Sequence, residues 1–286
     1  MAVYKRGYQR YSGPLTGGLA RFLVLPRYAW RRLYQRRLVL LLTIVAFVWP
    51  ILCGGFVYLT NHVELLQGLD KDFLQFIQVD GRFFSIFMYV QAGFAVFIAA
   101  LAGPSLIAPD LANNALPLYF SRPLTRWSYA LARLTVLVGM LSIVTWIPGL
   151  ILFGLQVGLA GGSWFRANWT LGAGMVIGFL VWLLILSLVA MASSAYVKWR
   201  VVAAAVSLAF FFILTGVAEM IDNVLRVTWG HIIDPAWAVN RVWCTLLGVD
   251  PPRGPDAGAS ALALAAMIAL LVLVIERKLR PVEIVS

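Results

Sequence analysis

Six long apolar runs account for most of this 286-residue chain and restrict the folds that it can adopt. Each run is long enough for a helix to cross the apolar core of a bilayer, which is about 30 Å thick and takes roughly 20 residues. Apolar residues make up 62% of the chain and charged residues 12%, whereas a soluble domain has about 45–50% and about 25%. The sequence therefore predicts an all-α polytopic membrane protein with about six transmembrane helices. The runs lie at residues 38–59, 83–106, 127–156, 169–197, 201–221 and 258–275.

The third run is longer than a bilayer requires, and it contains Gly139 and Pro148. Proline removes a helix hydrogen bond and is a frequent cause of a sharp kink. We therefore expect a kink or a tilt in this span.

The basic residues lie unevenly on the two sides of these spans. With the N-terminus inside, 17 of the 23 Lys and Arg residues fall in inside segments and 6 in outside segments. Basic residues close to spans are retained on the cytoplasmic side, so we expect both termini in the cytoplasm. The formal net charge of +11 then faces the headgroups of membrane lipids, and we expect no nucleic-acid partner.

Residues 1–37 are predicted to form a cytoplasmic tail and an amphipathic elbow helix at the membrane interface. Arg27 and Arg31 fall on one side of that helix, and Trp30 and Tyr34 fall on another. Pro26, just before them, is expected at the helix start. The alternative is a basic flank that only determines topology.

The outer segment 222–257 is too polar to span a bilayer, yet it is rich in Trp, Val, Ile and Leu. Short helices at the outer interface suit this composition, and the Pro/Gly-rich stretch 251–258 is expected to be a loop before the last span.

The residues that usually carry catalysis or bind metals are isolated in this chain. Cys53, Cys244, His62 and His231 show no metal-ligand spacing and no disulfide framework. His231 precedes Asp234 by three residues, but one such pair is no catalytic set. We expect no catalytic residue, metal site or cofactor site in the chain.

The connection between the second and third spans is unlike an ordinary loop. Asp110 follows a proline and is expected to cap a short helix over residues 111–120, and Pro123 prevents that helix from continuing into the third span. Arg122, Arg126 and Arg133 are expected to hold it at the cytoplasmic surface. Its apolar side chains have no obvious core beneath them, which is typical of a docking element.

This connection resembles the coupling loop of permease subunits of type-2 ABC exporters, the ABC-2 type permease family. Ser121-Arg122-Pro123-Leu124-Thr125-Arg126 is similar to the family's Ser-Arg-Pro-aliphatic-Ser/Thr-Arg run, with an acidic residue and polar residues before it and with Tyr129 and Arg133 after it. Two positions depart from the pattern, since Ala115 stands where Thr or Ser is common and Arg133 where Lys is common. The resemblance implies that these residues contact an ATPase: Asp110, Leu111, Asn113, Asn114, Leu116, Tyr119, Ser121, Arg122, Pro123 and Arg126.

The same resemblance implies a single six-span domain over residues 38–286, with a coupling loop at 104–126 and the outer segment at 222–257. It implies a cytoplasmic ABC ATPase dimer as partner, together with a second permease copy or a related permease that completes the transport path. None of the four lysines lies in a GxxxxGK[ST] context, so we expect no P-loop here, and ATP and Mg belong to the partner ATPase. The implied location is the cytoplasmic (inner) membrane of a prokaryote.

Three other functions are weighed against export by an ABC complex. An ABC-type complex could drive assembly, motility or signalling rather than transport. An ion-coupled secondary transporter commonly places charged residues in the middle of spans, and the first, second and fourth runs contain none. A membrane enzyme needs a constellation that the isolated His and Asp residues do not provide.

Overall fold

The computed structural model describes residues 18–62, 78–113 and 126–279, and every regular element in these ranges is helical. Six helical stretches there are long and apolar enough to cross a membrane, at Arg37–Asn61, Gly81–Asp110, Trp127–Ala160, Gly162–Tyr196, Arg200–Leu225 and Ala257–Lys278. The predicted number and order of spans are therefore confirmed. The elements are α1 (Gly18–Tyr34), α2 (Arg37–Asn61), α4 (Gly81–Ala102), α5 (Pro104–Ala112), α7 (Arg126–Val144), α8 (Trp146–Ala160), α9 (Gly162–Tyr196), α10 (Arg200–Leu225), η2 (Gly230–Ile233), α11 (Pro235–Leu247) and α12 (Ala257–Leu279).

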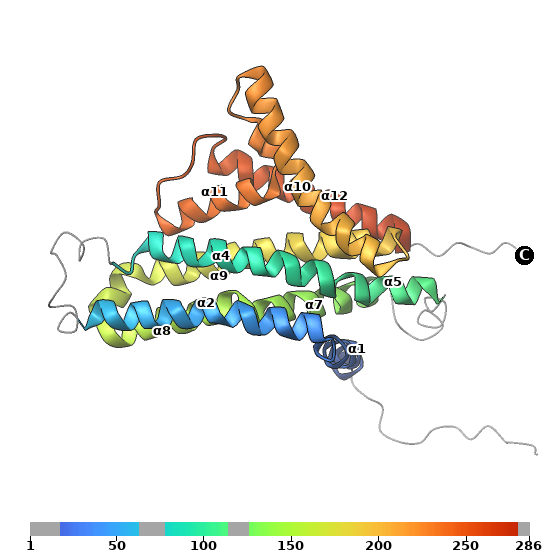
Figure 1. Ribbon diagram of the computed structural model, residues 1–286, viewed down its shortest axis with the longest axis horizontal. Helices are drawn as coiled ribbons and strands as arrows, with labels where there is room; N and C mark the ends of the chain where they lie inside the picture. The colour runs from blue at the N-terminus through green and yellow to red at the C-terminus, as the bar shows by residue number, and fades with distance from the viewer. Residues whose placement is uncertain (1–17, 63–77, 114–125, 280–286) are drawn as a thin grey trace, which may run out of the picture.

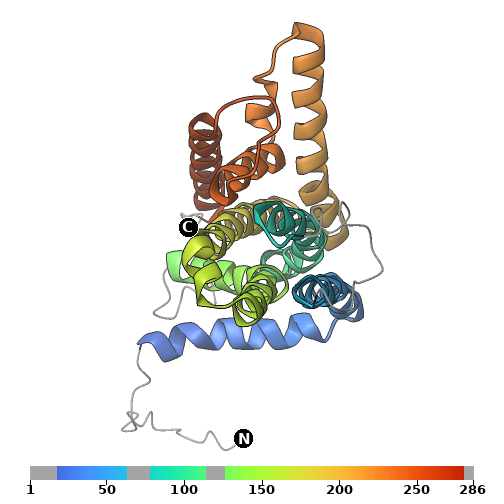
Figure 2. The same cartoon turned by 90° about the vertical axis from the view of Figure 1, so that its left-hand side faces the viewer.

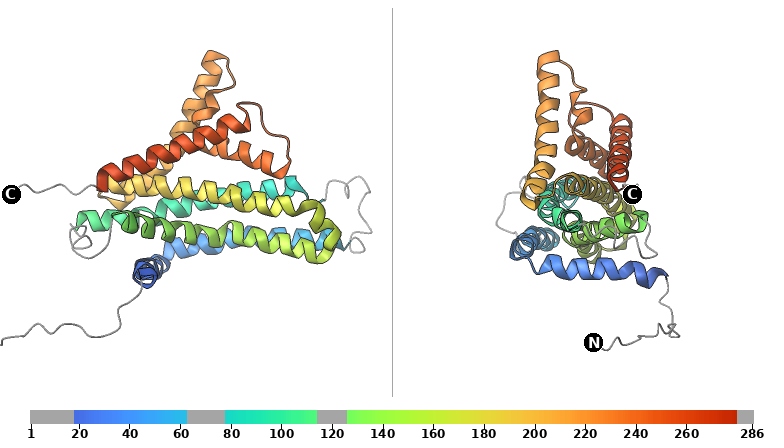
Figure 3. Two further views of the ribbon diagram at one scale, coloured as in Figure 1. Left: turned by 180° about the vertical axis from the view of Figure 1, so that it is seen from behind. Right: turned by 90° about the vertical axis from the view of Figure 1, so that its right-hand side faces the viewer.

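Helix α9 lies at the centre of the molecule and contacts α4, α5, α7, α8, α10, α11 and α12. On one side of α4 and α9 lie α2 and the α7–α8 pair, and on the other side lie α10, α11 and α12 (Figure 1). Helix α1 runs across one end of this bundle, transverse to the spans (Figure 2). We call this end the α1 end; α5 and the last residues of α12 also lie there (Figures 1 and 3).

The connection between the third and fourth spans is shorter than the sequence indicates. Helix α9 begins at Gly162 rather than near residue 169, and Gly161 alone separates it from α8. The φ of Gly161 is +86°, a conformation that a side chain would disfavour, so the chain reverses within one residue. Arg166 and Asn168, which made this stretch look like a loop, instead lie on the first turns of α9.

The third span breaks at Thr145, between α7 and α8, so the predicted kink is present. Pro148 lacks an N–H and leaves the carbonyl of Val144 without its helical donor; Pro50 has the same effect on Ala46 in α2. The fully buried Gln91 of α4 supplies both missing bonds: its Nε2 donates to the carbonyl oxygens of Ala46 at 3.1 Å and Val144 at 2.5 Å. The side-chain amide of one residue in α4 thus bonds two neighbouring spans at the positions of their prolines.

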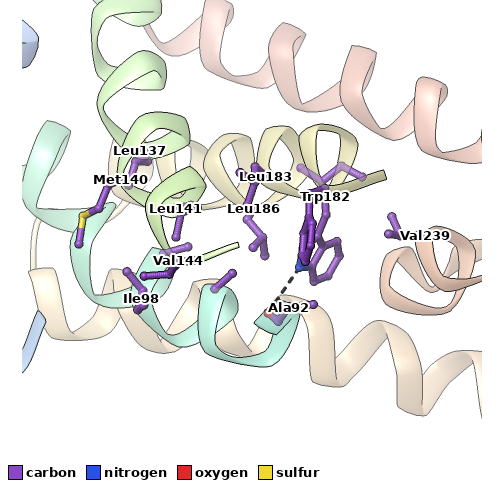
Figure 4. Packing of buried hydrophobic residues seen from close by; sticks show 14 of the residues in the cluster. Ala92, Ile98, Leu137, Met140, Leu141, Val144, Trp182, Leu183, Leu186 and Val239 are labelled. Carbon is purple, nitrogen blue, oxygen red and sulfur yellow. Dashed lines mark hydrogen bonds between the residues drawn. The ribbon is translucent and has the colours of Figure 1, made fainter. Parts of the chain in front are cut away.

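Close packing around α9 depends on its small residues. A Cβ on Gly178 would lie 2.5 Å from Cδ1 of Trp243 in α11, so only glycine fits there. Trp182, one turn later, packs between α4 and α11, and its Nε1 donates to the carbonyl of Ala92 at 3.5 Å (Figure 4). Leu183 and Leu186 face the side of α7 that carries Leu141 (Figure 4). Apolar packing of this kind holds α4, α7 and α11 against one central helix.

Helix α10 rises away from the bundle, and the chain returns through η2 and α11 to α12 (Figures 1 and 2). The segment predicted at 222–257 does contain short helices, but it starts later than expected because α10 continues to Leu225. Asp234 caps α11 by accepting from the backbone N–H groups of Ala236 and Trp237, and Pro235 occupies the first helical position.

Candidate functional site

The second span bends at the α1 end, where α4 gives way to α5. Pro104 has no N–H to continue the α4 hydrogen bonds, and α5 starts at this residue. Gly103, at the bend, lies against α9 so closely that an added Cβ would come 2.4 Å from Cβ of Ala190. The bend therefore seats α5 against the central helix.

A buried ion pair joins the last turn of α5 to the start of α7. Oδ2 of Asp110 accepts from Nη2 of Arg133 at 2.5 Å and from the hydroxyl of Tyr129 at 2.7 Å. The Arg133 guanidinium also lies over the Tyr129 ring, 5.1 Å from its centroid. The side chains of Arg133 and Asp110 are 10% and 13% exposed, and Tyr129 is fully buried. Each charge at this depth needs its partner, because a lone buried charge is strongly destabilising.

The expected roles of Asp110 and Arg133 were wrong in their geometry. Asp110 lies inside α5, near its C-terminal end, so it does not cap a helix that starts at residue 111; Arg133 is buried rather than at the surface. Residues 114–120 of the predicted helix lie outside the described residues. Tyr129 and Arg133 are four residues apart on α7, so they face the same way and together engage one carboxylate. This charge-assisted pair also compensates for an acidic residue near a helix C-terminus, which the helix dipole disfavours.

The remaining predicted coupling residues lie on either side of this pair. Asn113 is exposed and closes α5, since its backbone N–H and its Nδ2 both donate to the carbonyl of Pro109, at 3.1 Å and 2.8 Å. Leu111 and Arg126 belong to the ends of α5 and α7 by their backbone. The following predicted site residues lie outside the described residues: Asn114, Leu116, Tyr119, Ser121, Arg122 and Pro123.

The ion pair fixes the distance between the two ends of the predicted coupling segment. Asp110 comes four residues before residue 114, and Tyr129 comes four residues after residue 125. Helices α5 and α7 also each pack against α9, so the two helices on either side of this segment are joined to each other and to the central helix. The sequence contained the required signal, an acidic residue and an i, i+4 pair of Tyr and Arg, but not its spatial arrangement.

Helix α1 lies beside this site and packs on α7. Nε1 of Trp30 donates to the carbonyl of Val136 at 2.8 Å, and its ring occupies the notch left by Gly139, where a Cβ would come 2.5 Å from the indole. Arg27 and Arg31 are exposed, whereas Trp30 and Tyr34 are partly buried.

The boundaries of α1 differ from expectation. It begins at Gly18, so Pro26 lies in its interior and not at its start. Near the other end, Tyr34 is half-buried, and its burial raises the pKa of the phenol.

The described residues contain no group of three or more His, Cys, Asp or Glu side chains placed to hold a metal ion. His231 does not pair with Asp234, which caps α11. Its Nε2 instead lies 3.6 Å from Oδ2 of Asp222, and its ring stacks on Trp237. This cluster holds η2 against the end of α10, since Asp222 also accepts from the backbone N–H of Gly230 at 2.6 Å.

Neither protein-family models nor curated proteins match this chain. Its function is therefore inferred from its own residues. The architecture is that of a multi-pass helical membrane protein with a buried ion pair at one end of the bundle.

Proposed function

We propose that this chain is the membrane-spanning permease subunit of an ATP-driven ABC export complex. The observation that carries the proposal is the position of the Asp110–Arg133 pair at the two ends of the segment whose sequence resembles an ABC coupling loop. A coupling element must transmit force to the spans, and this pair supports that role because it joins α5 to α7 rigidly.

In the proposed mechanism, a cytoplasmic ABC ATPase dimer binds the segment 114–125 and moves it when the dimer closes on ATP and Mg. The Asp110–Arg133 pair makes α5 and α7 move together, and both helices press on α9. A second copy, or a related permease, completes the transport path. With 17 basic residues on its side of the spans, the α1 end faces the cytoplasm.

The direct test is co-purification of the ATPase from the source cells. The chain carrying Leu116→Ala and Tyr119→Ala is compared with the wild type and with a matched control, Ile51→Ala with Leu52→Ala, whose side chains are 71% and 59% exposed on α2. Truncating anchors at the centre of an interface costs about 2 kcal/mol or more, so the first variant should lose the ATPase while the control retains it.

Three outcomes would change the proposal. Normal ATPase binding by the Leu116/Tyr119 variant at normal membrane level would contradict the coupling role. An associated ATPase without measurable flux of any solute would favour the assembly, motility or signalling alternative. Turnover by the chain alone, driven by an ion gradient, would identify a secondary transporter.

A further inference from the structure

A pocket of about 380 Å³ opens at the α1 end, where α2 and α10 begin beside the end of α4. Three of its six lining residues are arginines and three are apolar, and most of the lining surface is apolar. The lining residues are Arg36, Arg37, Arg200, Leu38, Val39 and Leu101.

The three arginines of this pocket bring together positive charge that no carboxylate of the described residues neutralises. No carboxylate of the described residues lies within ion-pair distance of their guanidinium groups, and Asp110 is already engaged by Arg133. Burial lowers the pKa of Arg36, and the neighbouring charges of Arg200 and Arg32 lower it further. Arginines held together against mutual repulsion favour a bound anion, and their planar donors suit the oxygens of a phosphate.

The pocket lies at the boundary between polar and apolar surface. Arg36 immediately precedes α2, and Arg200 is the first residue of α10. Beyond them the exposed surface turns apolar at once, with Leu38 66% exposed and Val201 83% exposed, and Trp199 is 77% exposed beside Arg200. An exposed Trp next to arginines at a span end is typical of the headgroup level of a membrane.

We propose that this pocket binds the headgroup phosphate of an anionic phospholipid, with its acyl chains lying along Leu38 and Val201. The arginine guanidinium groups donate hydrogen bonds to the phosphate oxygens, and the apolar surface of the lining excludes a fully hydrated soluble anion. Basic pockets between spans are suited to anionic headgroups. The inference depends on the six spans and not on the export role.

The test uses native mass spectrometry of the detergent-solubilised full chain, titrated with phosphatidylglycerol or phosphatidylcholine, with inorganic phosphate as competitor. The pocket variant is Arg36→Gln with Arg200→Gln. The matched control is Arg27→Gln with Arg31→Gln, which removes the same charge from exposed positions of α1. Each arginine near a membrane surface contributes about fivefold to anionic-lipid affinity, so the pocket variant should bind phosphatidylglycerol about 25-fold more weakly than the wild type.

The control should stay within about threefold of the wild type, because distant exposed charges contribute only through a screened field. An equal loss in both variants would overturn the pocket, since only net charge would then matter. Equal affinity of the wild type for phosphatidylcholine, or full displacement by millimolar inorganic phosphate, would overturn the lipid assignment. The single variant Arg200→Gln repeats the test at an exposed residue, where the substitution should not disturb packing.

Discussion

The central helix α9 and the outer helices α10 and α12 are all strongly apolar, yet they occupy different environments. In the most apolar stretch of α9, 72% of residues are buried within the protein, compared with 22% in α10 and 22% in α12. The difference shows that the apolar character of a helix determines its insertion into the bilayer but does not determine which helices pack against it. Lipid chains satisfy an apolar side chain as well as a protein core does, so burial depends on shape and on small residues.

The bundle around α9 and the peripheral region of α10 to α12 also differ in how their polar groups are paired. In the bundle, Gln91 and the Asp110–Arg133 pair are buried and connect different helices. In the peripheral region of α10 to α12, the Asp222–His231 pair is partly exposed and connects the end of α10 to the adjoining η2. Substitutions at matched positions should therefore have larger effects in the bundle.

The largest difference is expected between the two ion pairs. Arg133→Leu leaves the Asp110 carboxylate buried without its cation, and it should lower the free energy of unfolding by about 3 kcal/mol. His231→Leu breaks a longer, partly exposed contact and should cost about 1 kcal/mol or less. Thermal unfolding of the detergent-solubilised chain measures both.

A double variant controls for the loss of packing at Arg133. Adding Asp110→Asn to Arg133→Leu removes the unpaired charge and should restore part of the lost stability. Equal destabilisation by Arg133→Leu and His231→Leu would contradict the distinction between the two regions.

Two glycines provide the next comparison. Gly178→Leu in α9 forces a side chain into Trp243, and overpacking of this kind costs about 1–3 kcal/mol. A Cβ on Gly216 in α10 meets no heavy atom within 4 Å, and this residue is exposed, so Gly216→Leu should be neutral or gain up to about 1 kcal/mol from helix propensity. The melting temperature should decrease for Gly178→Leu and should stay unchanged or increase for Gly216→Leu. An equal decrease in both variants would show that α10 is packed as closely as α9 at this position.

Gln91→Leu should have a smaller effect of about 1–2 kcal/mol, because two buried carbonyls lose their donor while the volume is retained. Thr215→Val in α10 is the control, since its hydroxyl bonds only within its own helix, to the carbonyl of Phe211 at 3.1 Å. Urea or thermal unfolding of the two variants gives the comparison. Pro148→Ala supplies a backbone N–H near the carbonyl of Val144. In that background, Gln91→Leu should lower the free energy of unfolding by less than it does in the wild type. An unchanged decrease would exclude the proposed role of Gln91 as the donor to this carbonyl.

The smallest effect is expected on the exposed face of α10. Phe212 is 70% exposed, so Phe212→Ala should change the stability of the isolated chain by no more than about 0.5 kcal/mol. Its neighbour Phe211 is 8% exposed and packs edge-to-face on Trp182, with ring centroids 5.4 Å apart. Phe211→Ala should therefore be clearly destabilising in the same melting experiment, and a reversed order would show that α10 is rotated.

The sequence alone determined the number, order and approximate limits of the spans. This was possible because the transfer of a segment into an apolar phase depends on the residues of that segment and on its length. It also predicted the kink near Pro148. Boundaries were less accurate where a polar residue such as Arg166 lay on a helix that continued beyond the apolar run.

Only the tertiary structure decided which residues meet. Asp110 and Arg133 are 23 residues apart, and Gln91 lies 45 and 53 residues from the carbonyls that it bonds. The basic pocket likewise combines Arg36 with Arg200, from spans that are not consecutive. Such pairs depend on which helices become neighbours, and equally apolar helices differ too little in local pattern to specify this. The arrangement is determined by close packing around the glycines of α9 and by the pairing of buried polar groups, which exist only once the helices have assembled.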